Sequence, residues 1–178
     1  MTDQELLELA TRCGFTHVST LNVPALEFRP EVRDMCAADK CHSYGRCWTC
    51  PPHCGTLEEV AEKARKYNRG ILVQCTGQME DDYDVETMID TEKLQKECFL
   101  KLVKELRTAY PDCLPMSAGA CTICSACTCP DEPCRCPELA IPSMEAFGLW
   151  VSKVCEDSGA RYYYGPKTIT FTSCILVD

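Results

Sequence analysis

The spacing of apolar residues along the chain predicts four helices, at residues 3–12, 57–68, 91–109 and 144–157. In the first of them, Leu6, Leu7 and Ala10 recur at helical spacing behind an acidic first turn. Thr56 and Glu59 form a capping-box pattern at the start of the second. The third carries one apolar stripe made of Leu94, Cys98, Leu102 and Leu106. Ser143 occupies the N-cap position of the fourth.

β-rich segments separate these helices, at residues 16–23, 71–77, 114–119, 160–164 and 168–177. Helices and strands therefore alternate, which predicts an α/β fold: a small mixed sheet of about four to six strands, flanked by helices. We expect residues 1–178 to form a single compact domain, because no linker or internal repeat divides the chain. The acidic segment 80–92 is expected to be solvated.

Two segments show neither the helical nor the strand-like spacing of apolar residues, and they hold most of the cysteines. Of the 17 cysteines, eleven lie in what we call the first cysteine loop (residues 30–56) and the second cysteine loop (residues 119–142). Residues 24–56 also contain four prolines, so we expect an irregular loop there. A long irregular loop inside a compact domain is usually functional, and a bound metal would order it.

The second cysteine loop has the more specific spacing. Cys121, Cys124 and Cys127 follow the pattern C-x2-C-x2-C, and further thiols follow at Cys129, Cys134 and Cys136. Thiolates at this spacing on a tight loop converge on one iron–sulfur cubane. Zinc usually takes two separated C-x2-C pairs. The spacing therefore favours a [4Fe-4S] cluster, with a zinc site as the alternative.

The first cysteine loop is rich in thiols but has no ferredoxin spacing. Its cysteines are sufficient for a cluster or for a zinc ion: Cys36, Cys41, Cys47, Cys50 and Cys54. His42 and His53 stand beside these thiols and are possible further ligands, although exposed loop histidines are the more ordinary interpretation. Trp48 would either shield a metal from water or pack under the loop.

These residues also carry a resemblance to a family. The pattern Cys36-x4-Cys41, Tyr44-Gly45-Arg46 and Cys50-Pro51-Pro52 resembles the first motif of a family of small, uncharacterised predicted metal-binding proteins of anaerobic bacteria and archaea. The second motif is similar too, with C-x2-C-x2-C followed by Pro133-Cys134-Arg135-x-Pro137 and Pro142-Ser143-Met144-Glu145-Ala146. The resemblance spans most of the chain and implies that it binds iron–sulfur clusters.

The resemblance also implies ligand sets. The second motif maps onto four ligands, Cys121, Cys124, Cys127 and Cys134, and the first onto three, Cys36, Cys41 and Cys50. This chain adds four thiols to the family pattern, Cys47, Cys54, Cys129 and Cys136. Either Cys47 or Cys54 would complete the first site, or one iron would stay open to solvent or substrate.

Charge and cysteine usage restrict the partners and the compartment. The net charge of −9 argues against nucleic acid and anionic membranes as partners, and it suits a basic face on a partner protein. An odd thiol count, clustered thiols and the absence of a signal-peptide pattern argue against a secreted disulfide scaffold. We therefore expect a cytoplasmic protein. No apolar run reaches the length of a membrane span.

Together these features predict a cytoplasmic iron–sulfur protein with two [4Fe-4S] clusters that exchanges electrons with a partner enzyme. An iron–sulfur enzyme with an open iron at the first cluster and a zinc-binding interaction module are the alternatives. No nucleotide, hydrolase or metalloprotease motif names a substrate, so enzyme activity stays open. Outside the loops, Cys75, Cys98, Cys155 and Cys174 are expected to be small buried hydrophobes.

Overall fold

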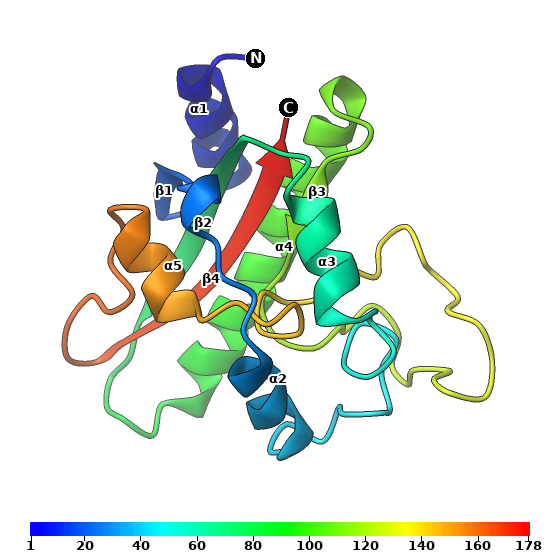
Figure 1. The fold of residues 1–178 in the computed structure, drawn as a ribbon. Coiled ribbons are helices and arrows are strands. Elements are labelled where there is room, and N and C mark those ends of the chain that lie inside the picture. Colours follow the sequence, from blue (N-terminus) through cyan, green and yellow to red (C-terminus); the bar gives the residue numbers. More distant parts are fainter.

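A four-stranded antiparallel sheet runs through the protein (Figure 1). The computed structural model describes residues 1–178. The strand order is β1-β2-β4-β3, with bounds β1 His17–Thr20, β2 Arg69–Gln78, β3 Leu114–Met116 and β4 Thr168–Val177. The α/β class and the number of strands confirm the prediction, whereas every strand pair is antiparallel and the expected sheet was mixed.

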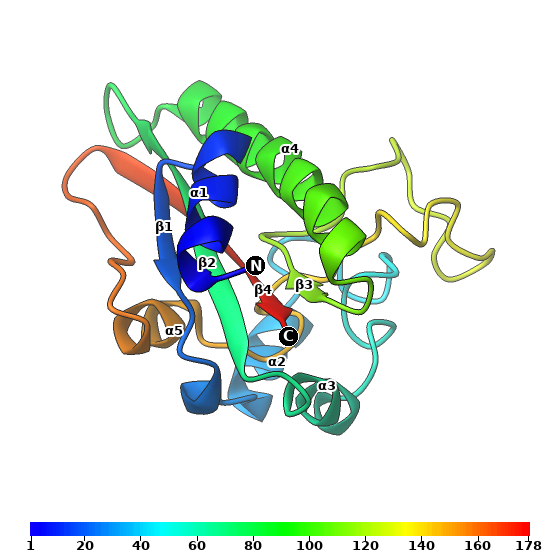
Figure 2. The same cartoon turned by 90° about the horizontal axis from the view of Figure 1, so that it is seen from above.

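Helices cover both faces of this sheet (Figure 2). Their bounds are α1 Asp3–Cys13, η1 Val23–Ala25, α2 Pro30–Ala37, α3 Leu57–Ala64, α4 Val85–Ala109 and α5 Val151–Asp157. Helices α1 and α4 pack on one face, and α3 and α5 pack on the other. Complete capping boxes begin both α1, at Thr2, and α3, at Thr56. The capping box of α3 confirms the prediction from Thr56 and Glu59.

Alternation along the two central strands builds two cores. In β2, Ile71 and Val73 face α1 and α4, while Leu72 faces α3 and α5. In β4, Ile175 faces the first set of helices and Leu176 the second. Successive side chains of a strand point to opposite faces, so a nearly continuous apolar run is what a sheet covered on both sides requires.

The cysteines outside the two loops belong to these cores. Cys75 and Cys98 are buried between β2 and α4, and Cys155 and Cys174 are buried on the opposite face. Burial raises the pKa of Cys75 to about 12 and that of Cys155 to about 11, so both stay protonated. The prediction that these four thiols are small buried hydrophobes is confirmed.

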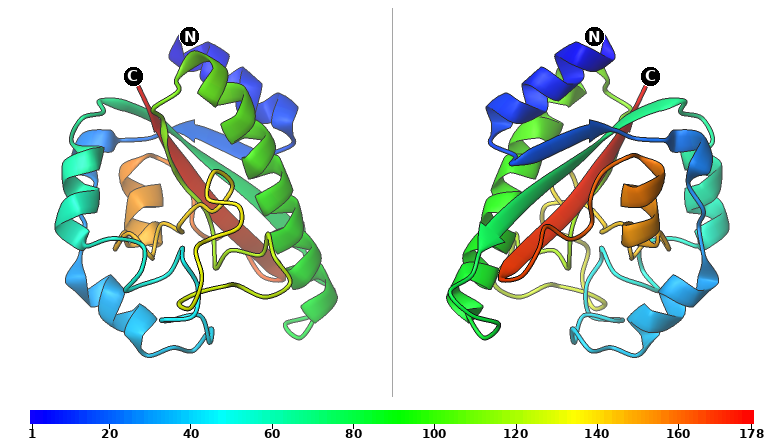
Figure 3. Two further views of the ribbon diagram at one scale, coloured as in Figure 1. Left: turned by 90° about the vertical axis from the view of Figure 1, so that its right-hand side faces the viewer. Right: turned by 90° about the vertical axis from the view of Figure 1, so that its left-hand side faces the viewer.

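Helix α2 and both cysteine loops gather at the end of the sheet away from the two termini (Figure 3). A parallel bridge between Ser117 and Ser143 joins the two ends of the second cysteine loop. The Ser117 amide donates to Pro142 O at 2.8 Å, and the Met144 amide donates to Ser117 O at 2.9 Å. The loop therefore leaves the sheet edge at β3 and returns beside it.

Several boundaries differ from the prediction. The segment 24–56 was expected to be irregular, but Pro30 at the first helical position starts α2 within it. The acidic segment 80–92 is largely accessible to solvent, as expected, but α4 begins within it at Val85 and not at residue 91. The Asp84 side chain caps the helix there by accepting a hydrogen bond from the Thr87 amide. Residues 160–164 form no strand.

The last predicted helix is also shorter than expected. Helix α5 begins at Val151, whereas residues 143–148 form turns in which Ser143 Oγ accepts from the Ala146 amide at 3.1 Å. Gly148 causes the break: its φ of +82° is left-handed, and a Cβ there would meet the Leu57 side chain and lie 3.1 Å from Arg29 O.

None of the helices combines the length and the apolar character needed to cross a membrane.

Candidate metal centre

Six cysteine side chains line one cavity beneath the second cysteine loop, which we call the thiol-lined cavity: Cys47, Cys121, Cys124, Cys127, Cys134 and Cys136. Hydrogen bonds within the loop set its path. Thr128 Oγ donates to Pro133 O at 2.9 Å, and Arg135 Nη1 donates to Ala126 O at 3.0 Å. The loop folds back on itself and turns its thiols inward, as the short spacing of its first three cysteines requires.

Cys47 reaches this cavity from the first cysteine loop. It is buried, and its Sγ lies 3.3 Å from Thr49 Oγ1. A hydrogen bond from the Cys50 thiol lowers the pKa of Cys47 to about 4, with further bonds from Thr49 and from the Cys121 amide. The same bond raises the pKa of Cys50, which favours the proton on Cys50 and the thiolate form on Cys47. A thiolate is the form that binds metal.

The two cysteine loops touch at two further places. Trp48 Nε1 donates to Glu132 O at 3.1 Å, and Cys129 Sγ donates to Gly45 O at 3.8 Å. Cys129 is buried at this contact and does not line the thiol-lined cavity. Trp48 lines that cavity too.

Two other thiols of the first loop lie beside residues 144–147. Cys36, at the end of α2, donates to Glu145 O at 3.9 Å, and Cys54 donates to Ala146 O at 3.5 Å. Burial raises the pKa of both thiols; the nearby charges of Glu145 and Cys41 raise that of Cys36 further. Cys41 is exposed. We call Cys36, Cys41, Cys50 and Cys54 the first thiol group.

Glu145 and Arg33 flank the first thiol group with opposite charges. Solvent reaches the Glu145 side chain, yet enough protein surrounds it that desolvation raises its pKa. Arg33 Nη2 donates to Gly55 O at 2.9 Å, while its Nε is buried without a partner. The Arg33 charge lowers the pKa of both Cys36 and Cys54, opposing burial. The guanidinium therefore favours the thiolate forms of this group.

Helix α4 holds the start of the second cysteine loop. Lys96 Nζ donates to Glu92 Oε1 at 2.5 Å and to Ala120 O at 2.8 Å, directly before Cys121. Gly119 lies under this pair with φ +64°, and a Cβ there would come within 3.1 Å of Glu92 Oε1. Sequence reasoning missed Lys96 and Glu92, whose i,i+4 spacing on a helix was the available signal.

The structure thus redistributes the predicted ligands. One cavity brings together the four predicted ligands of the second site, Cys121, Cys124, Cys127 and Cys134. Cys136 and Cys47 line it as well, although Cys47 was expected as a possible ligand of the first site. His42 is exposed with φ +57°, and His53 packs edge-on against Trp48 with ring centroids 5.1 Å apart. Neither histidine lines the thiol-lined cavity.

The donor set of the thiol-lined cavity fits a soft metal. All of its cysteines are free thiols, and no carboxylate or imidazole lines the cavity with them. The cavity volume is about 20 Å³, and no three side chains of His, Cys, Asp or Glu converge on one point within it. Soft thiolate donors select zinc, Cu(I) or iron–sulfur clusters.

This combination of a thiol-rich loop and a thiol-lined cavity defines a metal-binding protein. The family model described as "Predicted metal-binding protein (DUF2284)" matches residues 19–177, so the chain belongs to the DUF2284 family. The match agrees with the metal-binding family that the two motifs resemble. Searches of curated proteins and of solved structures found no match. The kind of metal stays a prediction, as do the anaerobic source and the partner.

Proposed function

We propose that this protein binds two [4Fe-4S] clusters and exchanges electrons with a partner protein. Cys121, Cys124, Cys127 and Cys134 would hold one cluster in the thiol-lined cavity. The first thiol group would hold the other, with Cys54 as its fourth ligand, since Cys47 lines the other cavity. When bound, such clusters supply reversible one-electron transfer.

The observation that carries this proposal is the set of six thiols around one cavity, with Cys47 arriving from the other loop. Six donors exceed the four that one cubane or one tetrahedral zinc ion needs, so two thiols would remain beside the metal. The contacts between the loops keep the two thiol groups adjacent, and adjacent clusters exchange electrons readily. Cys47 or Cys136 would remain near the cluster as a hydrogen-bond partner of its sulfur atoms, which tunes the potential.

The protein itself contributes position, shielding and charge. The Lys96–Glu92 pair fixes the peptide before Cys121, and Trp48 lines the cavity, where its ring would limit the access of water. The net charge of −9 suits docking on a basic face of the partner, with an on-rate that falls as salt rises.

The decisive experiment measures iron, sulfide and zinc per chain on protein purified without oxygen, with EPR spectra before and after dithionite. About eight irons and eight sulfides with a reducible signal would support two cubanes. Cys124→Ala should remove about half of the iron, whereas the buried core variant Cys174→Ala should keep all of it. Zinc without sulfide would contradict the proposal and favour a zinc-binding interaction module.

A second candidate is an enzyme with an open iron at the first thiol group. The exposure of Cys41 and the solvent access of the Glu145 carboxyl beside Cys36 favour it, since a substrate could reach that site. Cyanide or a small thiol should then shift the EPR signal of this cluster alone. A signal that no small ligand moves would contradict this candidate and leave the electron carrier.

A further inference from the structure

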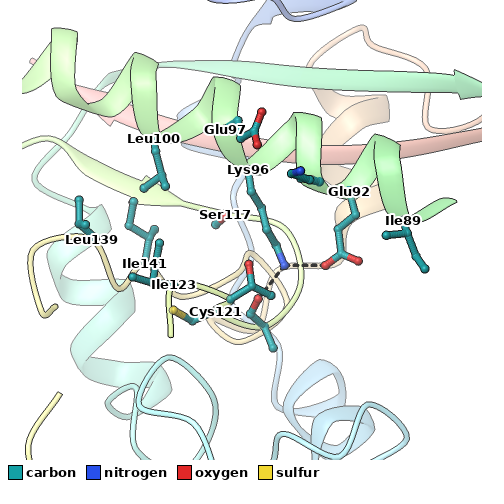
Figure 4. Close-up of a pocket in the computed structure, with 13 residues that line it drawn as sticks. Ile89, Glu92, Lys96, Glu97, Leu100, Ser117, Cys121, Ile123, Leu139 and Ile141 are labelled. Carbon is teal, nitrogen blue, oxygen red and sulfur yellow. Dashed lines mark hydrogen bonds and ion pairs between the residues drawn. The ribbon is translucent and has the colours of Figure 1, made fainter. Parts of the chain in front are cut away.

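A second, larger cavity lies between α4 and the second cysteine loop (Figure 4). Its volume of about 520 Å³ falls within the usual range of small-molecule sites. We call it the side cavity. Cys121 and Ile123 line both the side cavity and the thiol-lined cavity, so one wall separates the two. Nothing in the proposed electron transfer requires this space.

The side cavity has an apolar end and a charged end. Leu100, Ile123, Leu139 and Ile141 gather at the apolar end, and the Lys96–Glu92 pair crosses the other (Figure 4). Leu139 is 41 % exposed although it is a large apolar side chain. Sites for small organic molecules combine such an apolar lining with a few placed polar groups that fix orientation.

Lys96 is the polar group best placed to hold a ligand. Its side chain is only 14 % exposed, and its ammonium group uses two of three donors, on Glu92 Oε1 and Ala120 O. One donor therefore remains for an acceptor inside the cavity. The charge of Glu92 is already paired with Lys96, while Lys93 and Glu97 are exposed at the margin and offset each other.

We propose that the side cavity binds a small carboxylic acid with an apolar chain. Its carboxylate accepts the free Lys96 donor, and its chain lies against Leu100, Ile123 and Ile141. A charge-assisted hydrogen bond in a largely buried place is the strongest contact this lining offers. The bound acid lies against Cys121, whose thiol is shared with the metal centre. This inference goes beyond the proposed function, because it assigns a ligand to a space that electron transfer does not use.

The test is calorimetric titration of the full-length protein, purified without oxygen, with hexanoate and with hexylamine. These probes share their apolar chain and differ in charge. Hexanoate should bind roughly tenfold or more tightly than hexylamine. Lys96→Met should weaken hexanoate binding about 10- to 100-fold, the loss of one charge-assisted hydrogen bond. Lys104→Met removes the same charge from an exposed position on α4 that does not line the side cavity, and it should change hexanoate binding by less than about threefold.

Two results would overturn the inference: equal binding of both probes, or unchanged hexanoate binding in Lys96→Met. If Lys96→Met does not fold, Leu100→Trp replaces it, because a larger ring fills the apolar end and should abolish binding of hexanoate while the protein stays folded. Hexanoate binding that survives Leu100→Trp would equally exclude this cavity. Iron and sulfide measured on the same samples keep the outcome separate from that of the cluster proposal.

Discussion

The sheet framework and the cysteine loops are held in place by different forces. The framework, meaning the four strands with α1 and α4, buries a continuous apolar core on the face that these helices cover. Between Gly119 and Ala140, by contrast, Cys129 is the single buried residue. So few apolar contacts do not offset the entropy of ordering twenty-odd residues. We therefore expect the second cysteine loop to depend on bound metal for much of its stability, and the framework not to.

A large-to-small change in the framework should have the greatest effect. Phe99 on α4 is 1 % exposed within the core, so Phe99→Ala should lower the free energy of unfolding by about 3–5 kcal/mol. Leu139→Ala in the second cysteine loop should change it by less than about 0.5 kcal/mol. Urea unfolding followed by circular dichroism measures both. Similar losses for the two variants would erase the distinction between the regions.

Metal removal should act in the opposite way. A chelator under reducing, oxygen-free conditions should leave most of the far-ultraviolet circular dichroism unchanged, because the four strands and the two longest helices, α1 and α4, lie in the framework. Trypsin cleavage after Arg135, which is exposed in the second cysteine loop, should accelerate roughly tenfold or more as the loop opens. A loss of helical signal on chelation would show that the framework needs metal too. Unchanged cleavage would show that the loop is ordered without it.

The two thiol groups offer a sharper comparison. Cys47→Ala should perturb the cluster that Cys121→Ala perturbs, because both residues line the thiol-lined cavity. Cys54→Ala should instead resemble Cys36→Ala, because both donate to the 145–146 backbone. Each change should remove or alter at most about half of the iron. Iron content and the EPR spectrum of the remaining cluster show which cluster each variant affects. A Cys47→Ala spectrum like that of Cys36→Ala would contradict the placement of Cys47 at the thiol-lined cavity.

The smallest expected effect concerns charge near the first thiol group. Removing the Glu145 carboxylate favours the reduced, more negative form of a cluster at Cys36, so Glu145→Gln should raise its reduction potential by roughly tens of millivolts. An EPR-monitored redox titration at alkaline pH, which favours the ionised carboxylate, measures the shift. The potential of the other cluster should stay constant, as should both potentials in the control Glu8→Gln, whose carboxylate is exposed on α1. Equal shifts in both clusters would argue for a general charge effect.

The framework could largely be predicted from sequence because its signals are local. The capping boxes, the helical stripe of α4 and the apolar runs of β2 and β4 each lie within one element. The missed features depend on long-range contacts. Nothing in residues 143–148 shows that Gly148 packs against Leu57 and Arg29, and this contact is what delays α5.

The candidate site divides in the same way. The C-x2-C-x2-C spacing predicts that Cys121, Cys124 and Cys127 converge, because a short loop leaves few alternatives, and all three line one cavity. Spacing cannot show that Cys47 crosses from the first cysteine loop or that Lys96 lies beside Ala120. Those placements follow from the way α4 and the two loops meet in space.

The bridge between Ser117 and Ser143 has a consequence for how this protein can evolve. Its two backbone hydrogen bonds fix both ends of the second cysteine loop at the edge of the sheet. Lengthening such a closed loop costs only about 0.6 kcal/mol for each doubling of its length. Insertions that carry new ligands or a new recognition surface should therefore be tolerated between these serines, so that relatives can diversify their sites while inheriting one sheet.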